Sequence, residues 1–229
     1  MNLIIAQFFY LFSRKKISNQ GKESAFMKSN RFYFSNEKKY LDNDHDLIKS
    51  LINICDFTEK YENKNLFTKY VLKKNFTFIQ NGMTNQKHCD ELPEKLLFAL
   101  KEGLGRSDIL KLANSFFRCD FSTVNVRSWI FYPQKDKKDD HVHKHFDTGF
   151  PKGSLKIMFY KGSFAKQPAL SIFTENNRFD IDGKNPLVLF ESNRLLHGAM
   201  APKDKIRPTV ELTLIPRFSG KAVLQQAGY

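Results

Sequence analysis

The sequence predicts an α+β fold that is mostly β, with helical segments first and a larger β-core after them. Before about residue 120, apolar residues recur at helical spacing, whereas from residue 121 short β-branched and aromatic segments alternate with turn residues. Several short strands in succession are typical of a sandwich or a barrel. No linker divides the 229 residues, so we expect one domain: a mainly helical lead-in with some strands over 1–120, and a β-core over 121–229.

The lead-in begins with an amphipathic segment, 41–61, whose apolar residues lie at helical spacing. Asn43 and Asp44 precede these apolar residues and are residue types that cap helix starts. Further on, segment 67–82 is rich in β-branched and aromatic residues and ends in an Asn-Gly turn dipeptide. One helix and one extended segment are therefore expected here.

Two more helices are expected directly before the β-core. Segment 91–105 has Pro93 early and Gly103 late, which are the usual limits of a helix. A short second helix is expected to start at Ser107. These helices complete the lead-in.

Five strands are expected in the β-core, each bounded by Gly, Pro, Asp or Asn. They cover 122–133, 154–162, 168–175, 186–192 and 209–217. Since alternate residues of a strand share a face, Lys156, Met158 and Tyr160 lie opposite an all-apolar set. The apolar set is assigned to the core, so Lys156 and Tyr160 are expected to line a pocket or to face solvent.

The first of these strands carries two further residues of interest. Trp129 is the only tryptophan and is expected in the core. Arg127 shares its face and is a candidate contact for an anionic group.

The chain is strongly basic: 37 Lys and Arg against 24 Asp and Glu give a formal net charge of +13, with a pI of about 9.6. Such a charge attracts acidic partners, namely a nucleic acid, a membrane surface or an anionic substrate. The lysines are dispersed, however, and an abundance of Lys, Asn, Phe and Ile is typical of AT-rich coding sequence. We therefore expect a small-molecule substrate and no nucleic-acid partner, and an anionic substrate stays open.

Cysteine usage and the N-terminus bear on localisation. Cys55, Cys89 and Cys119 are odd in number and form no C-x-x-C pair, which indicates reduced thiols in a cytoplasmic protein. The apolar start MNLIIAQFFYLF is shorter than the roughly 20 residues that cross a bilayer, so no membrane span is expected. It also lacks the features of a secretory signal. We expect it to pack as a helix, with an interfacial anchor as the alternative.

Three histidines fall within HVHKHFDTGF, residues 141–150. His145 and Asp147 form an H-x-D pair between two predicted strands, and residues two apart in an extended segment project to the same face. Two histidines and one carboxylate suit non-haem Fe(II) and leave positions open for substrate and O2. A charged surface loop is the alternative interpretation. His141 and His143 are expected to face solvent or to support the ligands from behind.

A third ligand and a carboxylate-binding pair follow downstream. His197 is the remaining histidine of the β-core and comes directly after the predicted strand 186–192. Arg207 follows ten residues later, with Thr209 two residues beyond it on the last strand. A guanidinium offers a bidentate fork to a carboxylate, and a hydroxyl two positions along a strand faces the same way.

The order of His145-Phe146-Asp147, then His197, then the R-P-T motif at 207–209 resembles the Fe(II)/2-oxoglutarate-dependent oxygenases, most closely the phytanoyl-CoA dioxygenase-like branch. The resemblance covers roughly the last 110 residues, including NVRSWIFYPQ, SLKIMFYKG and VLFESNRLLHGAM. It implies a double-stranded β-helix core of the jelly-roll or cupin-like kind, flanked by helices. The first 120 residues match only as an unspecific lead-in.

The resemblance implies that His145, Asp147 and His197 hold Fe(II) and form the catalytic centre. It implies that 2-oxoglutarate chelates the metal while Arg207 and Thr209 bind its distal carboxylate, with Arg127 and Lys156 as further candidate contacts. O2 is the second co-substrate, and 2-oxoglutarate is decarboxylated to succinate while an unactivated C–H bond of a small-molecule or carrier-bound substrate is oxidised. Halogenating members lack the carboxylate ligand. Hydroxylation is therefore favoured here, and desaturation or cyclisation stays open.

Three alternatives compete with this interpretation. Nucleic-acid demethylases of the same fold carry a second Arg six residues after the first on the last strand, where this chain has Thr213. A cupin-type metal enzyme would have more histidines and a Glu in the first cluster. A non-catalytic β-sandwich binding module with a histidine-rich surface loop is the alternative from outside the enzymes.

Overall fold

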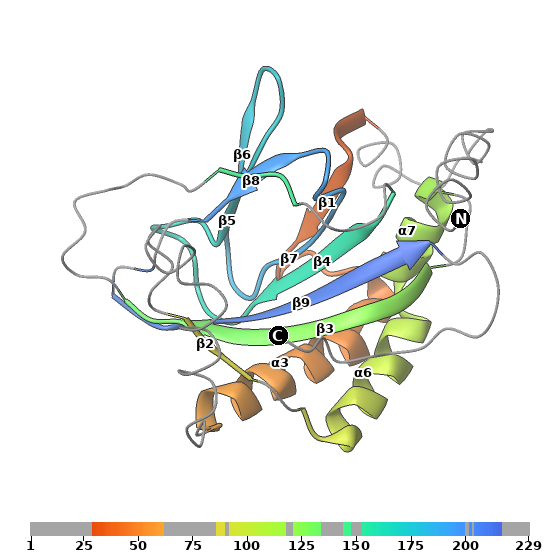
Figure 1. The fold of residues 1–229 in the computed structure, drawn as a ribbon, viewed down its shortest axis with the longest axis vertical. Helices are drawn as coiled ribbons and strands as arrows, with labels where there is room; N and C mark the ends of the chain where they lie inside the picture. The colour runs from red at the N-terminus through yellow and green to blue at the C-terminus, as the bar shows by residue number, and fades with distance from the viewer. Residues whose placement is uncertain are drawn as a thin grey trace, which may run out of the picture.

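The computed structural model describes residues 29–61, 86–89, 92–117, 121–133, 144–147, 153–199, 202 and 204–216. Within them, the chain forms two antiparallel sheets that face each other, and helices cover the outer face of the larger sheet (Figure 1). The predicted order of a mainly helical lead-in and a β-core after it is confirmed, and both sheets are antiparallel.

The large sheet has six strands in the order β1-β7-β4-β9-β3-β2. Their bounds are Phe32–Ser35 for β1, Gln86–His88 for β2, Phe121–Phe131 for β3, Leu155–Tyr160 for β4, Leu187–Phe190 for β7 and Arg207–Pro216 for β9. The last of the described strands, β9, lies inside the sheet because it pairs with β3 on one side and β4 on the other.

The small sheet has three strands in the order β6-β5-β8. They are Arg178–Ile181 for β6, Leu170–Phe173 for β5 and Leu196–Gly198 for β8. A bridge between His145 and His197 attaches the 144–147 segment to the outer side of β8. The small sheet therefore brings two of the predicted metal ligands side by side.

Three helices are described: α3, His45–Lys60; α6, Glu94–Arg106; and α7, Asp108–Phe117. A short 3-10 helix, Asp42–Asp44, precedes α3. Helix α3 packs against β3 and β9 and also contacts α6, so the helices form one layer beneath the large sheet (Figure 1). None of the helices described is both long enough and apolar enough to cross a bilayer.

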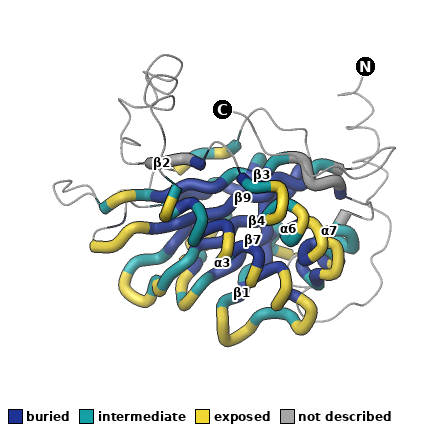
Figure 2. The backbone as a smooth tube through the Cα atoms, turned by 90° about the horizontal axis from the view of Figure 1, so that it is seen from below, coloured by how far each residue is buried: buried dark blue, intermediate teal, exposed yellow. Residues whose placement is uncertain are grey.

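Alternation along the central strands gives the large sheet two different faces. Leu155, Ile157 and Phe159 of β4 are buried against the helices, as predicted from the sequence. Met158 and Tyr160 are buried on the opposite face, between the two sheets. Figure 2 shows these central strands as buried and the peripheral turns as exposed. The Lys156 and Tyr160 face thus lines the space between the sheets rather than facing solvent.

Four short strands were not predicted from the sequence: β1, β2, β6 and β8. Each has three or four residues, and β1 pairs with β7, which lies far along the chain. Their stability comes from pairing with other strands, which local propensity does not reveal. Strands β5 and β7 are as short, but they lie within longer β-branched and aromatic segments. The five strands that were predicted correspond to β3, β4, β5, β7 and β9.

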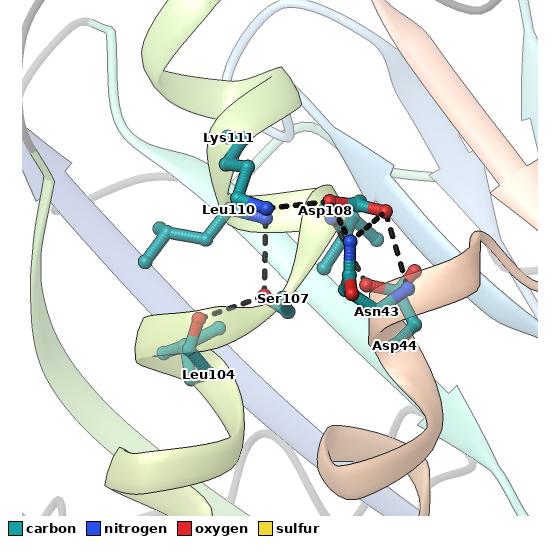
Figure 3. Close-up of polar contacts among 8 residues, drawn as sticks. Asn43, Asp44, Leu104, Ser107, Asp108, Leu110 and Lys111 are labelled. Carbon is teal, nitrogen blue, oxygen red and sulfur yellow. Dashed lines mark hydrogen bonds and ion pairs between the residues drawn. The ribbon is translucent and has the colours of Figure 1, made fainter.

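The expected helix cap at the start of α3 needs a correction. Asp44 occupies the N-cap position of α3, but no side-chain hydrogen bond caps that helix. Instead, Asp44 Oδ1 accepts a hydrogen bond of 3.1 Å from the backbone N–H of Ile109 at the start of α7. Asn43 likewise binds Asp108, with Nδ2 3.0 Å from both carboxylate oxygens (Figure 3). Both residues therefore hydrogen-bond to the start of α7, which is distant in sequence, rather than capping α3.

Gly103 also differs from its expected role as a helix limit. It lies inside α6, which continues to Arg106. A Cβ at this position would lie 2.9 Å from the backbone nitrogen of Leu47 in α3. Gly103 thus permits the close approach of two helices. The next helix begins one residue after the predicted start, at Asp108, and Ser107 caps it: its hydroxyl oxygen accepts a hydrogen bond from the N–H of Leu110 at 3.3 Å (Figure 3).

Several sequence features lie outside the described residues, namely the apolar N-terminus, segment 67–82, Cys119, His141 and His143. Cys55 and Cys89 are described, and both are buried. Trp129 is buried between the sheets as expected.

Substitution of Gly103 by Ala is expected to destabilise the protein by about 1–3 kcal/mol, because the added Cβ meets helix backbone that cannot move aside easily. Gly105→Ala is the matched control in the same helix. Nothing lies within 4 Å of its Cβ position, so it should stabilise by up to about 1 kcal/mol through helix propensity. Urea denaturation of both variants measures the difference, and equal effects would refute the close-approach explanation.

The carboxyl group of Asp44 should make stability depend on pH. Burial raises its pKa from 3.8 to about 6, although hydrogen bonds from Ile109 and Asp108 act in the opposite direction. The folded state therefore holds its proton more tightly than the unfolded state, so this group's contribution to stability falls as pH rises from about 4 to 6. In Asp44→Asn that fall should be absent. Between pH 4 and pH 7 the free energy of unfolding of the variant should therefore rise relative to that of the unaltered protein, on the order of 2–3 kcal/mol. Denaturation of both proteins at pH 4 and pH 7 tests this.

Candidate metal centre

Three side chains converge between the 144–147 segment and β8. The ligand atoms of His145, Asp147 and His197 all lie within 4.8 Å of one another. Asp147 Oδ1 is 3.7 Å from His145 Nε2 and 3.8 Å from His197 Nε2. Donor atoms on one transition-metal ion lie about 3 to 4 Å apart, so a small contraction brings all three onto one ion. The H-x-D pair and the distant histidine are thus brought together.

Backbone pairing sets these side chains in place. His145 and His197 exchange two backbone hydrogen bonds, of 2.8 and 3.0 Å. The N–H of Asp147 donates to the carbonyl of Ser192 at 3.0 Å, so the H-x-D segment is bound both to β8 and to the turn before it. Phe146 lies between the two ligands and is half exposed, since its side chain points the other way.

The turn between β7 and β8 is held by a buried carboxylate. Glu191 forms ion pairs with Arg31 at 2.6 Å and with Arg194 at 3.1 Å, and its side chain is fully buried. Because this turn leads into His197, these ion pairs stabilise the position of the third ligand.

The tautomer of His197 is the one that can bind a metal through Nε2. The Leu195 carbonyl lies 2.9 Å from Nδ1, and a carbonyl only accepts, so Nδ1 carries the proton and the Nε2 lone pair faces Asp147. Burial lowers the pKa of His197 to about 4, so the imidazole is neutral at neutral pH. The ring packs edge-on against Phe190 at 4.9 Å between centroids. A neutral, oriented imidazole is the form that binds metals.

The second oxygen of Asp147 faces a buried lysine. Lys156 Nζ on β4 lies 2.6 Å from Asp147 Oδ2 and 2.8 Å from Glu211 Oε2 on β9. Burial alone would raise the pKa of Asp147, but the charge and hydrogen bond of Lys156 outweigh it and the net pKa is lowered. Burial likewise opposes the charge of Lys156, yet Glu211 and Asp147 raise its pKa. Asp147 and Lys156 are therefore both ionised.

Arg207 begins β9 and is 2% exposed, with its guanidinium between the two sheets. It donates to the carbonyl of Ala169 at 3.3 Å and lies over the Phe131 ring at 4.4 Å. Burial lowers its pKa to about 10. Thr209 faces the same way and is fully buried, with its hydroxyl 3.3 Å from the Arg207 carbonyl. A desolvated cation here is suited to an anionic ligand.

Tyr160 stands beside Arg207 on the neighbouring strand, opposite Thr209. Its ring is 5.9 Å from the guanidinium, and its buried hydroxyl donates to the sulfur of Met158 at 3.4 Å, a weak acceptor. Burial raises its pKa above the usual range, so the hydroxyl stays protonated. It is therefore a donor available to a ligand.

The remaining predicted residue is Arg127 on β3. It lies opposite Glu211 of β9, and Arg127 Nη1 is 3.9 Å from Glu211 Oε1. The sequence patterns assign no role to Glu211, and they place Tyr160 only on a face that lines a pocket or meets solvent. Alternation was a usable signal for both, because it places Glu211 on the face of Arg207 and Tyr160 on the face of Lys156. Their partners depend on strand register, which no local pattern reveals.

No protein-family model matches the chain, and no curated protein matches it. Solved structures do share its fold. A 2OG-Fe(II) oxygenase family oxidoreductase from Burkholderia pseudomallei has a TM-score of 0.55 at 9% identity, covering 87% of this chain and 92% of that one. The non-heme alpha ketoglutarate dependent epimerase SnoN from nogalamycin biosynthesis has a TM-score of 0.54 at 10% identity, covering 85% and 80%.

A prolyl hydroxylase from Trichoplax adhaerens, solved with a hypoxia inducible factor peptide, has a TM-score of 0.52 at 15% identity and covers 93% of both chains. At these identities the likeness concerns the fold. The chain therefore has a mixed helical and antiparallel β fold similar to that of 2-oxoglutarate and Fe(II) oxygenases. The phytanoyl-CoA dioxygenase-like branch receives no support beyond the sequence resemblance.

The metal centre predicts a metal-dependent rise in melting temperature. A divalent ion such as Mn(II) at 100 times its Kd should stabilise the folded protein by about 2.7 kcal/mol. His145→Ala should lose most of this rise, because one of three ligands is gone. His45→Ala, an exposed histidine at the start of α3, is the matched control and should keep it. An equal metal-induced rise in both variants would contradict the assigned site.

Proposed function

We propose that this protein is an Fe(II)- and 2-oxoglutarate-dependent oxygenase that oxidises an unactivated C–H bond of a small-molecule or carrier-bound substrate. The observation that carries the proposal is the convergence of His145, Asp147 and His197, with ligand atoms within 4.8 Å, in a fold similar to that of such oxygenases. Two imidazoles and one carboxylate suit Fe(II) and leave the rest of the coordination sphere open.

The buried polar side chains between the sheets also suit the co-substrate. Arg207 offers a buried guanidinium for the distal carboxylate of 2-oxoglutarate, with the Thr209 hydroxyl on the same face. Tyr160 is a third candidate, since within the described part of the chain its protonated hydroxyl donates to a weak acceptor, the thioether sulfur of Met158. Bound iron would activate O2 and, with decarboxylation of 2-oxoglutarate to succinate, supply the oxidising power. The chain's own part is to hold the ligands, orient the co-substrate and exclude water.

The finer assignments belong to the same proposal. We assign the sheets to a double-stranded β-helix within a single domain over 1–229, and the activity to hydroxylation, since Asp147 is present as the carboxylate ligand. Arg127 and Lys156 stay predicted co-substrate contacts, and the cytoplasm stays the predicted compartment. An anionic substrate would fit the basic chain.

The competing functions lack a comparable observation. For a nucleic-acid demethylase, the residue six positions beyond Arg207 would be a second Arg, and here it is the buried Thr213. A binding module with a surface-histidine loop would leave His197 without reason to be buried and oriented toward Asp147. The oxygenase is therefore favoured.

Anaerobic addition of Fe(II) and 2-oxoglutarate should produce the weak visible charge-transfer band of a chelated complex. Arg207→Met keeps the side chain's length and removes its charge, so 2-oxoglutarate should bind about 100-fold more weakly, which corresponds to about 3 kcal/mol. Arg178→Met, at an exposed arginine of β6, is the matched control and should leave the titration unchanged.

If the unaltered protein gives no band and binds no 2-oxoglutarate, the oxygenase assignment fails and the binding module gains. If the band appears, succinate release measured across candidate substrates identifies the substrate class. Affinity for bulk RNA or DNA that falls steeply with salt would instead favour a nucleic-acid partner.

A further inference from the structure

The two oxygens of Asp147 face different partners. Oδ1 is the oxygen that lies toward both imidazoles, at 3.7 and 3.8 Å from their Nε2 atoms. Oδ2 lies 2.6 Å from the ammonium group of Lys156. One oxygen is thus directed to the metal position, while the other is already bound.

Lys156 is itself held in place. Its Nζ lies 2.8 Å from Glu211 Oε2, and the side chains of Lys156 and Glu211 are only 7% and 5% exposed. They project from neighbouring strands, where Lys156 is opposite Thr213 and Glu211 is opposite Met158, so the pair is diagonal across the sheet. Thr213 Oγ1 donates to Glu211 Oε1 at 3.4 Å. Buried charges with several partners have little freedom to move.

We propose that Lys156, anchored by Glu211, is a positioning residue that holds Asp147 Oδ2 and so leaves only Oδ1 to the metal. The inference rests on the proposed function. A carboxylate can bind a metal through one oxygen or both. With six positions in total, three protein donor atoms and two from 2-oxoglutarate leave one position for O2, whereas a bidentate Asp147 leaves none.

Lys156→Met tests this, because it keeps the length of the side chain and removes the ammonium group. Asp147 would then be free to bind the metal through both oxygens, so Fe(II) affinity should change by less than about threefold. With Fe(II) and saturating 2-oxoglutarate bound, nitric oxide serves as a neutral ligand of the size of O2. It should bind at least roughly tenfold more weakly than to the unaltered protein.

Two further variants separate this role from other effects. Lys156→Met combined with Glu211→Gln removes the carboxylate left unpaired by the single change, and it should stay defective for nitric oxide binding if Lys156 acts on Asp147. It also supplies a folded protein if the single variant is too unstable. Lys161→Met is the matched control: Lys161 also joins two carboxylates, Asp56 and Glu59, but these lie on α3. It should bind nitric oxide normally.

The outcomes are distinct. Normal nitric oxide binding in both Lys156 variants overturns the inference. If these variants also bind 2-oxoglutarate more weakly, Lys156 is a direct co-substrate contact instead. Loss of Fe(II) binding in both variants also overturns it, because Lys156 would then build the metal site rather than keep a position open. If the unaltered protein binds neither Fe(II) nor 2-oxoglutarate, the proposed function itself fails.

Discussion

The structure depends on the pairing of β9 with β3 on one side and β4 on the other, which places this strand at the centre of the large sheet, between the helices and the small sheet. Val210, Leu212 and Leu214 face the helices and supply apolar area to that core. The opposite face carries polar residues that are also buried, namely Arg207, Thr209, Glu211 and Thr213. Burying such groups costs free energy unless they are paired. This polar face can be buried because β3, β4 and the small sheet provide partners for it.

Those partners divide the polar face into two regions. At the start of β9, Arg207 reaches the carbonyl of Ala169 and lies against aromatic rings, which leaves a desolvated cation suited to a carboxylate. Further along, Glu211 faces Lys156, which in turn faces Asp147. In the proposed function, the central strand contributes to co-substrate binding at one point and to the orientation of Asp147 at another. These polar groups lie beside the apolar residues that fill the rest of the space between the sheets.

Much of this arrangement was predictable from sequence. Strands β3, β4, β5, β7 and β9 and helices α3, α6 and α7 follow from hydrophobic periodicity and from the residues that limit each segment. Strands β1, β2, β6 and β8 did not, since they depend on pairing with other strands. Capping by Asn43 and Asp44 was assigned to the wrong helix for a similar reason: a side chain's partner is set by packing, and the nearest backbone N–H groups in sequence are not the nearest in space.

The sequence by itself determined which side chains are available to the site. Residues two apart on an extended segment share a face, so local geometry alone groups the His and Asp of H-x-D and the Arg and Thr of R-P-T. The later histidine is recognisable by its position after a predicted strand. Tertiary structure decided how they are combined. The bridge between His145 and His197 and the register of β4 on β9 set which oxygen of Asp147 faces the imidazoles and which faces Lys156. Register depends on how whole strands are buried and on which distant segments the fold brings together. No pattern within a single segment holds that information.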